Sequence, residues 1–193
     1  EKYIPEGAEC ITMDFPMLSL SEDREILKKQ WASNADTIEM ILKQDKNAVF
    51  LTLGDPMVFS TYSYVMAYLI KRGLAVQTVS GVPAFCNLAA QVGIPLTQGE
   101  ESLGIAAMTQ PIGEIRSILD AHQNIVVMKV SANNAELARE LKKRGLEKAF
   151  VLISNIGMDN QTIVRDIAVL EDKVPYLSTV LIKKDYPWDS TGM

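Results

Sequence analysis

The chain has 193 residues, of which 48% are apolar and 22% are charged, a composition typical of a globular protein with enough apolar residues for a core. Its net charge of −5, from 24 acidic and 19 basic residues, argues against a general nucleic-acid binder, which normally carries a basic excess. No apolar run reaches the length of a membrane span and no signal peptide is recognisable, so we expect a cytoplasmic protein without a membrane partner.

Side chains that commonly bind metal ions are sparse. Cys10 and Cys86 are the only cysteines, and their wide separation without CxxC spacing predicts two reduced thiols. The single histidine, His122, follows an apolar helical face, which indicates a structural or surface role. We therefore expect no metal site.

The first half of the chain alternates predicted helices with short apolar runs. Apolar residues at helical spacing predict helices over residues 23–43, 62–70 and 84–92. The runs NAVFLTL and AVQTV, at residues 47–53 and 75–79, are typical of strands buried on both faces. Alternation of this kind predicts a parallel sheet with right-handed crossovers. The chain begins without Met, as EKYIPEGAECITMDFP, and reads like a helix end running into a strand, so we expect that the natural N-terminus is missing.

The stretch GIPLTQGEES, at residues 93–102, interrupts this alternation with Gly and Pro. We place the domain boundary there and expect an N-terminal domain over residues 1–97 and a C-terminal domain over residues 98–193. In the second domain, strands at LGIAAM, NIVVMKV and AFVLIS alternate with helices over residues 112–121 and 133–144. Asn133 and Glu136 could form a capping box at the start of the latter helix.

The last two predicted strands, QTIVRDIAVL and YLSTVLIKK, follow each other without a helix between them. Strands joined in this way are typical of antiparallel pairing. The predicted fold is therefore α/β, with a parallel sheet in the first domain and a mixed sheet in the second.

In open α/β sheets, ligands bind beyond the carboxyl ends of the strands, which directs attention to the loop after NAVFLTL. Gly54 allows close approach of a ligand or a positive φ, and Asp55 can accept hydrogen bonds from ribose hydroxyls or an amine. Ser60 and Thr61 stand where a helix N-cap belongs. A plain turn followed by a helix cap explains the same residues.

Three further polar loops follow predicted strands, at SGVPAF, MKVSANN and SNIGMDNQ. Each alone fits an ordinary turn, but a doubly wound sheet could bring all of them to one pocket. Met57, Val58, Met128 and Ile156 would supply apolar walls, a lining that suits a nucleoside. The sequence contains neither a phosphate-binding GxxxxGK[ST] or GxGxxG loop nor a GxSxG or HExxH motif.

The stretch LGDPMVFSTYSYV, followed by VSGVPAFCNLAAQVGIPL, ESLGIA, IVVMKV and YLSTVLIK, resembles the tetrapyrrole methylases over nearly the whole chain. These are S-adenosylmethionine-dependent enzymes of corrin and sirohaem synthesis. Ser60-Thr61-Tyr62 after Gly-Asp-Pro, together with SGVPAF, is most similar to members that methylate carbon 20 of precorrin-2 or of cobalt-factor II. The family opens with a glycine-rich strand end of the kind VGxGPGDP, and this chain departs from the pattern because it has none.

The resemblance implies two α/β domains with the cofactor in the cleft between them, a homodimer, a tetrapyrrole substrate and S-adenosylhomocysteine as product. It implies cofactor contacts by Gly54, Asp55, Met57, Val58, Ser60, Thr61, Pro83, Ala84, Met128, Asn155, Ile156, Ser178 and Thr179. It identifies no catalytic residue, because an electron-rich meso carbon can attack the sulfonium methyl group once the two are held in line and water is excluded. Arginines and lysines should bind the carboxylates of the substrate.

Two alternatives remain open on the sequence. Some proteins of this fold methylate RNA or a protein side chain, although the acidic composition argues against RNA. The chain could also be a non-catalytic nucleotide-binding module.

Overall fold

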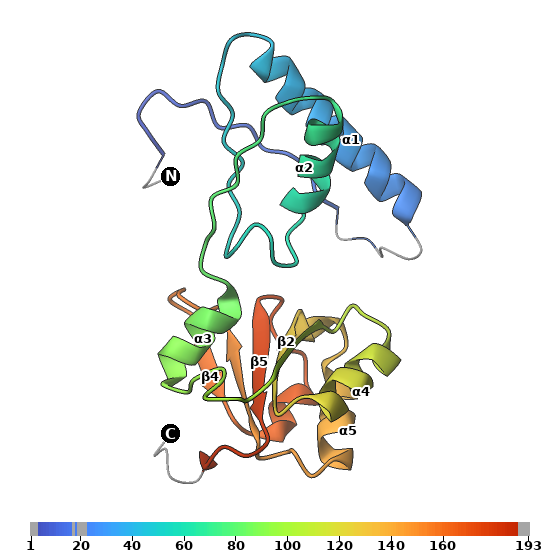
Figure 1. Ribbon diagram of the computed structural model, residues 1–193, viewed down its shortest axis with the longest axis vertical. Coiled ribbons are helices and arrows are strands. Elements are labelled where there is room, and N and C mark those ends of the chain that lie inside the picture. Colours follow the sequence, from blue (N-terminus) through green and yellow to red (C-terminus); the bar gives the residue numbers. More distant parts are fainter. Residues whose placement is uncertain (1–3, 17, 19–22, 189–193) are drawn as a thin grey trace. The chain divides into compact units, whose positions relative to one another are not determined.

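The computed structural model describes residues 4–16, 18 and 23–188, which form two compact units, Glu1–Gly81 and Val82–Met193. The helices are α1 Arg24–Leu42, α2 Tyr62–Lys71, α3 Ala84–Val92, α4 Ile112–Ala121 and α5 Asn134–Lys143. The strands are β1 Leu103–Ala107, β2 Asn124–Met128, β3 Phe150–Ser154, β4 Thr162–Val164 and β5 Ser178–Lys183. All five predicted helices are confirmed to within a residue or two (Figure 1). The boundary at 97/98 stays a prediction, and the first three residues of the chain lie outside the described part.

The first unit is built on the packing of α1 against α2. The apolar stripe of α1 that predicted the helix is buried, with Leu27, Trp31 and Ile38 in the core beside Val65 and Leu69 of α2. The ring of Trp31 also stacks on that of Tyr64, with the centroids 4.1 Å apart and the planes nearly parallel. Gly73 ends α2 with a φ of 77°, in the left-handed region that glycine adopts at low cost.

The prediction of a parallel sheet in this unit is wrong for its described residues, because no strand forms at 47–53 or 75–79. Neither segment makes a backbone hydrogen bond to any described residue, so no ladder joins them. Their apolar side chains are buried on one side only: Phe50 and Val76 pack on the helices, whereas Val49, Leu51 and Leu53 are 71–82% exposed. Burial on both faces, which the apolar runs predicted, therefore does not occur.

The second unit contains a mixed sheet with the strand order β1-β2-β5-β3-β4. β1 pairs with β2 in parallel, whereas β5 runs antiparallel between β2 and β3, and β4 pairs antiparallel with β3. The predicted mixed sheet is confirmed. The stretch QTIVRDIAVL is a strand only at β4, because Ile167–Leu170 turns into a 3-10 helix that the side chain of Asp166 caps through the Ala168 N–H.

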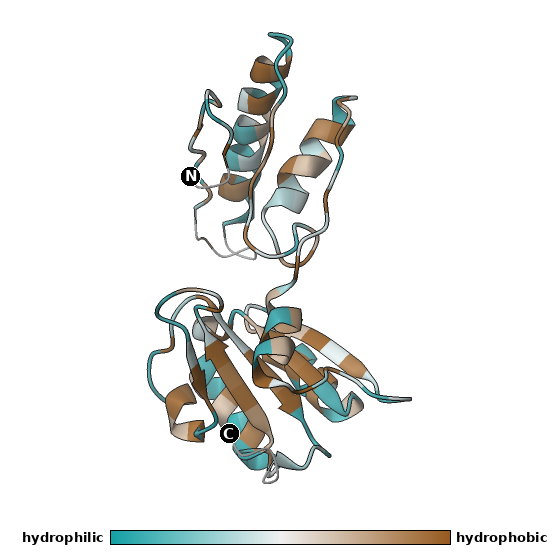
Figure 2. Ribbon diagram, turned by 90° about the vertical axis from the view of Figure 1, so that its left-hand side faces the viewer, coloured by the Kyte–Doolittle hydropathy of each residue, from teal (hydrophilic) through white to brown (hydrophobic). Residues whose placement is uncertain are grey.

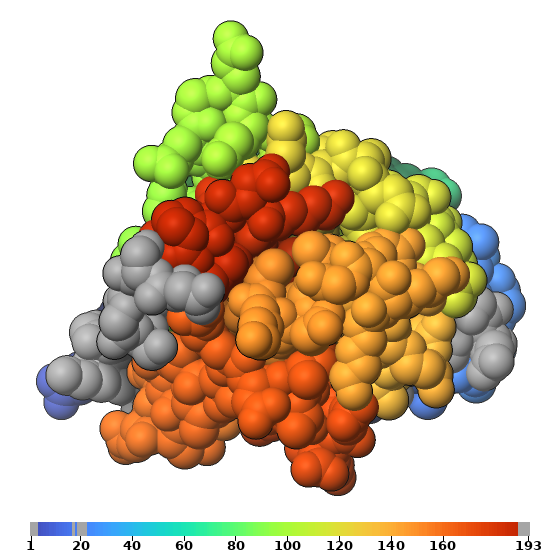
Figure 3. All heavy atoms as spheres, turned by 90° about the horizontal axis from the view of Figure 1, so that it is seen from below, coloured from blue at the N-terminus to red at the C-terminus, as the bar shows by residue number. Residues whose placement is uncertain are grey.

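Helices cover both faces of this sheet (Figure 1). On one face, Ile115 and Leu119 of α4 and Leu137 and Leu141 of α5 form a core with alternate strand residues such as Val127. Helix α3 packs on β5 and buries Phe85 and Leu88. Figure 2 shows that the strands of this sheet are mainly hydrophobic, whereas the helices beside them carry both hydrophilic and hydrophobic residues. Figure 3 shows the chain from α5 onward covering much of the lower face.

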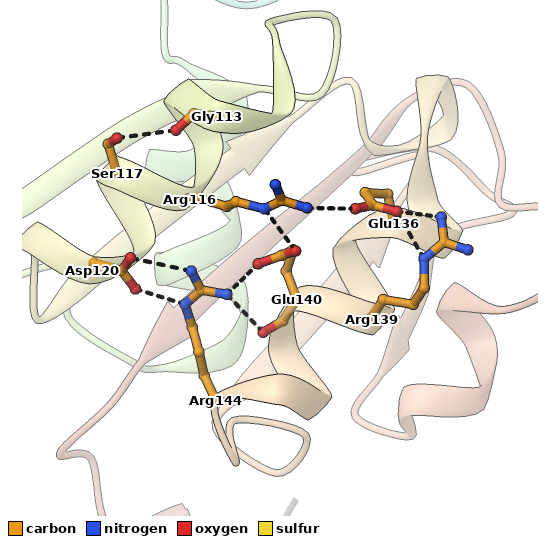
Figure 4. A network of polar contacts seen from close by, with 8 residues as sticks. All are labelled: Gly113, Arg116, Ser117, Asp120, Glu136, Arg139, Glu140 and Arg144. Atoms are coloured by element: carbon orange, nitrogen blue, oxygen red, sulfur yellow. Dashed lines mark hydrogen bonds and ion pairs between the residues drawn. The ribbon is translucent and has the colours of Figure 1, made fainter.

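A polar network joins α4 to α5 on the outer side (Figure 4). Glu140, only 3% exposed, lies between two guanidinium groups and accepts from Arg116 at 2.8 Å and from Arg144. Burial alone would raise the pKa of Glu140, but the hydrogen bonds from Arg144 and Arg116 outweigh it, so the pKa is lowered. The predicted capping box is wrong, because the Asn133 side chain makes no cap bond and Glu136 pairs with Arg116 instead.

The segment that interrupts the alternation, residues 93–102, is tied to β5 by a buried lysine. Lys183, 2% exposed, donates to the carbonyl of Pro95 at 2.9 Å and to the carboxylate of Glu101 at 3.0 Å. Helix α3 ends at Val92, and Gly93, the first residue of this segment, is its C-cap with a φ of 65°, as expected for glycine. The cation is therefore compensated within the second unit.

Candidate functional site

The Gly-Asp-Pro loop of the first unit is held by the carboxylate of Asp55. Oδ1 accepts from the backbone N–H of Met57 at 2.8 Å, and Oδ2 accepts from the Ser80 hydroxyl at 2.6 Å and the Gly81 N–H at 3.1 Å. These bonds, that of Ser80 first and that of Met57 next, hold the pKa of Asp55 below its ordinary value. The expected role of this carboxylate toward a ribose or amine stays a prediction; in the structure it joins the loop to residues 80–81.

Two glycines allow this loop to form. Gly54 has a φ of 73°, the positive value that the sequence left as one of two explanations for this residue. Gly81 lies so close to the loop that a Cβ there would stand 2.2 Å from the carbonyl oxygen of Gly54. Ser80 and Gly81 were not predicted as partners of the loop, although the Ser-Gly pair directly after AVQTV was the available signal.

The hydroxyl pair that follows the loop marks the start of α2. Thr61 is the N-cap residue but makes no side-chain cap bond, and the Ser60 hydroxyl instead accepts from the Tyr62 N–H at 3.2 Å. The capping role predicted for the pair therefore falls to Ser60. Met57, 56% exposed, and the half-buried Val58 offer apolar surface next to Gly54.

The second unit brings the remaining candidate residues to one sheet edge, except for Pro83 and Ala84 at the start of α3. Strands β1, β2 and β3 run in the same direction, so their carboxyl ends meet the amino end of β5. Met128 ends β2, Asn155 and Ile156 follow β3, and Ser178 begins β5 opposite Ser154. This is the edge at which α/β sheets commonly bind ligands.

Hydroxyl groups at this edge are largely satisfied within the protein. The Ser178 hydroxyl is buried, lies 2.7 Å from that of Ser154 and donates to the Pro175 carbonyl at 2.6 Å. Thr179 is 6% exposed. The half-buried Met128, Asn155 and Ile156 are more accessible, so they are better placed than the hydroxyls to contact a ligand.

Backbone strain marks the same edge. Lys129, directly after β2, and Asn155, directly after β3, both have a φ of 53°, a left-handed conformation that is unfavourable for a lysine above all. Such residues concentrate at ligand sites, where the surrounding structure maintains them. Lys129 was not predicted from the sequence, because no residue pattern indicates its conformation.

Within the described residues, no group of three or more His, Cys, Asp or Glu side chains lies close enough together to hold a metal ion. His122, the single histidine, packs against Gly104, and its buried Nδ1 has no hydrogen-bond partner in the part of the chain that the structure describes. Among the helices of the described chain, none is long and apolar enough to span a membrane.

Comparison with known proteins assigns the chain to a protein family. Residues 2–169 match the family described as Tetrapyrrole (Corrin/Porphyrin) Methylases. The chain belongs to the tetrapyrrole methylases. This membership confirms the resemblance carried by the Gly-Asp-Pro loop and SGVPAF.

Curated relatives of this methylase extend over most of its length. A probable cobalt-precorrin-2 C(20)-methyltransferase of Methanocaldococcus jannaschii is 31% identical over 93% of this chain and 74% of its own. The cobalt-precorrin-2 C(20)-methyltransferase of Salmonella typhimurium is 28% identical over 96% of this chain and 78% of its own.

The solved structures confirm the fold of the methylase. Uroporphyrin-III C-methyl transferase from Thermus thermophilus, complexed with S-adenyl homocysteine, superimposes with a TM-score of 0.61 at 19% identity, over 84% of this chain and 74% of its own. At this identity the likeness shows the α/β fold alone, and substrate preference must be argued from the sequence relatives and the site.

Proposed function

We propose that this methylase transfers a methyl group from S-adenosylmethionine to carbon 20 of precorrin-2, or of its cobalt form, in cobalamin biosynthesis. The observation that carries the proposal is the agreement of two relatives of that printed activity, which match 93% and 96% of the chain. The Ser60-Thr61-Tyr62 sequence after Gly-Asp-Pro, on which the resemblance to this subgroup rests, agrees with it.

The residues present fit an adenosine-containing ligand by their chemistry. Met128 and Ile156 are half-buried apolar side chains at the carboxyl edge of the sheet, and Asn155 beside them carries an amide that can both donate and accept. In the other unit, Gly54 leaves bare backbone beside Met57 and Val58. The thirteen residues expected to contact the cofactor remain, on this basis, our proposal for its site.

Bound S-adenosylmethionine would supply an electrophilic methyl group, which the electron-rich meso carbon of a reduced tetrapyrrole can attack. The protein's task is then to orient two reactants and to exclude water. The fixed geometry of the Asp55 loop, with three hydrogen bonds to one carboxylate, suits a positioning role. This division of labour requires no nucleophilic side chain of the protein.

We further propose a homodimer in the cytoplasm, as the family resemblance implies. Support comes from exposed apolar residues such as Val49, Leu51 and Leu53, and from the lack of a membrane-spanning helix among the described residues. A monomeric mass by light scattering at high protein concentration would contradict the dimer.

Calorimetric titration with S-adenosylhomocysteine tests the cofactor part of the proposal, and turnover of metal-free and cobalt-loaded precursors tests the substrate part. Binding together with methylation of either precursor supports it. Binding without turnover, combined with a salt-dependent affinity for RNA, would favour the RNA methyltransferase alternative. Absence of binding would favour the non-catalytic module.

A further inference from the structure

Lys129 combines an unfavourable backbone conformation with a position at the proposed site. It directly follows β2 at the carboxyl edge, where Met108 donates its N–H to the Met128 carbonyl at 2.9 Å. Its φ of 53° repeats that of Asn155 at the end of β3, which runs in the same direction as β2 on the other side of β5. Asn tolerates this conformation readily, so the unfavourable φ at Lys129 is the observation that draws attention to this edge, because such residues concentrate at functional sites.

The ammonium group of Lys129 lacks compensation. The side chain is half-buried, yet among the described residues it makes no ion pair and no hydrogen bond. The buried Lys183 shows the contrast, since it has a carboxylate and two carbonyls as partners. Burial lowers the pKa of Lys129 for the same reason, because desolvation disfavours a cation without a counter-ion.

An anionic ligand would remove this deficit. Both candidate ligands of the proposed reaction carry carboxylates, but that of the cofactor belongs to an amino-acid group with its own ammonium, whereas the tetrapyrrole carries several carboxylates without internal cations. A cation held without a protein partner suits the ligand with the larger negative charge.

We propose that Lys129 binds a carboxylate of the tetrapyrrole substrate and so helps to orient the ring against the methyl donor. The inference rests on the proposed function and names a residue that holds the substrate. It assigns no proton transfer to Lys129.

The test measures the dissociation constants of cobalt-factor II and of S-adenosylhomocysteine for four variants. Lys129→Met removes the charge at nearly constant length, and Lys129→Arg retains it. Lys129→Gly removes the charge and also relieves the positive φ. Lys173→Met, at an exposed lysine of the same unit without an ion pair to a described residue, is the control for the loss of one positive charge.

We expect Lys129→Met to raise the dissociation constant of cobalt-factor II about 10- to 100-fold, the loss of one charge-assisted contact, and Lys129→Arg to restore part of the affinity. S-adenosylhomocysteine should bind all four variants within about twofold of wild type, since the contact is with the substrate. Lys129→Gly should melt at a higher temperature than wild type and still bind substrate weakly. If the lysine had only a structural role, its melting temperature and its substrate affinity would not change in opposite directions.

Equal affinity for cobalt-factor II in wild type, Lys129→Met and Lys173→Met overturns the assignment of Lys129 and leaves the proposed function standing. An equal loss of affinity in Lys129→Met and Lys173→Met also overturns it, because the effect is then one of net charge. A parallel loss of S-adenosylhomocysteine binding in Lys129→Met transfers the contact to the cofactor and overturns the substrate role. Failure of the wild-type protein to bind either cobalt-factor II or its metal-free form overturns the proposed function itself and this inference with it.

Discussion

Replacing Gly81 with alanine tests the close approach that holds the Gly-Asp-Pro loop. The added Cβ would stand 2.2 Å from the carbonyl oxygen of Gly54, 3.0 Å from its carbonyl carbon and 3.4 Å from the Cα of Asp55. These are backbone atoms and cannot rotate away as a side chain would. The two segments must therefore separate by about 1 Å to reach an ordinary carbon–oxygen contact.

Such a displacement has consequences for both stability and binding. Overpacking of this kind costs about 1–3 kcal/mol, which for a chain of this length lowers the melting temperature by about 2–12 °C. It also stretches the bond from the Gly81 N–H to Asp55, 3.1 Å long at present. Because the loop that loses this restraint contains four of the proposed cofactor contacts, and two more follow it at the start of α2, the affinity for S-adenosylhomocysteine should fall as well.

Gly113→Ala provides the matched control, since Gly113 lies in α4 with no atom within 4 Å of an added Cβ. Alanine is the better helix former, so this variant should be as stable as wild type or up to about 1 kcal/mol more stable. Urea unfolding and calorimetric titration with S-adenosylhomocysteine are measured on both variants. Wild-type stability and affinity in Gly81→Ala would refute the argument that the two segments need to touch.

Three further predictions concern single residues. Because the pKa of Asp55 is lowered in the folded protein, its contribution to stability is full above the unfolded-state pKa of about 3.9 and is lost as the pH falls through the folded-state pKa. Urea unfolding should therefore show that wild type loses stability more steeply on acidification than Asp55→Asn. Parallel curves of stability against pH would contradict this. Glu140→Gln should lower the free energy of unfolding by about 1–3 kcal/mol, between the values for exposed and buried ion pairs. The control Glu171→Gln, at an exposed pair, should lower it by under about 1 kcal/mol. Equal losses of stability in urea titrations would show that the network in Figure 4 contributes no more than an exposed ion pair. Gly54→Val should abolish binding of S-adenosylhomocysteine in calorimetry. The control Gly73→Val, with a similar φ of 77° at the end of α2, should lose stability but keep its affinity. Unchanged affinity in the folded fraction of Gly54→Val would show that bare backbone at this position is not needed for binding.

The helices could be predicted from the sequence because their signals are local. The apolar spacing of α1 and the glycines at 73, 93 and 145 determine where each helix lies and ends, and all three glycines have positive φ. Strands β2, β3 and β5 of the second unit were found for a related reason, since their apolar runs are almost entirely buried. The prediction of strands at 47–53 and 75–79 failed because a strand needs a neighbouring strand with which its backbone can pair. The residues of an apolar run do not reveal whether such a neighbour is present.

The candidate site was predictable in part. The edge formed by Met128, Asn155 and Ile156 follows from the rule that ligands bind after the strands, whereas the same rule led to Gly54 from an apolar run that forms no strand. The bond between Asp55 and Ser80 joins residues 25 positions apart, a distance over which sequence patterns carry no information about contacts. The conformation of Lys129 was equally hidden, because the surrounding structure imposes it against the residue's own preference.

The central claim is methyl transfer to one carbon of a tetrapyrrole, and its most direct measurement is the position of the new methyl group. The purified protein is incubated with cobalt-factor II, and in parallel with its metal-free form, and S-adenosylmethionine carrying a carbon-13 label in the methyl group; the product is then analysed by NMR spectroscopy and mass spectrometry. The account predicts a product heavier by one labelled methyl group, attached at carbon 20. Transfer to a different carbon, or no transfer to either tetrapyrrole by protein that binds S-adenosylhomocysteine, would contradict it.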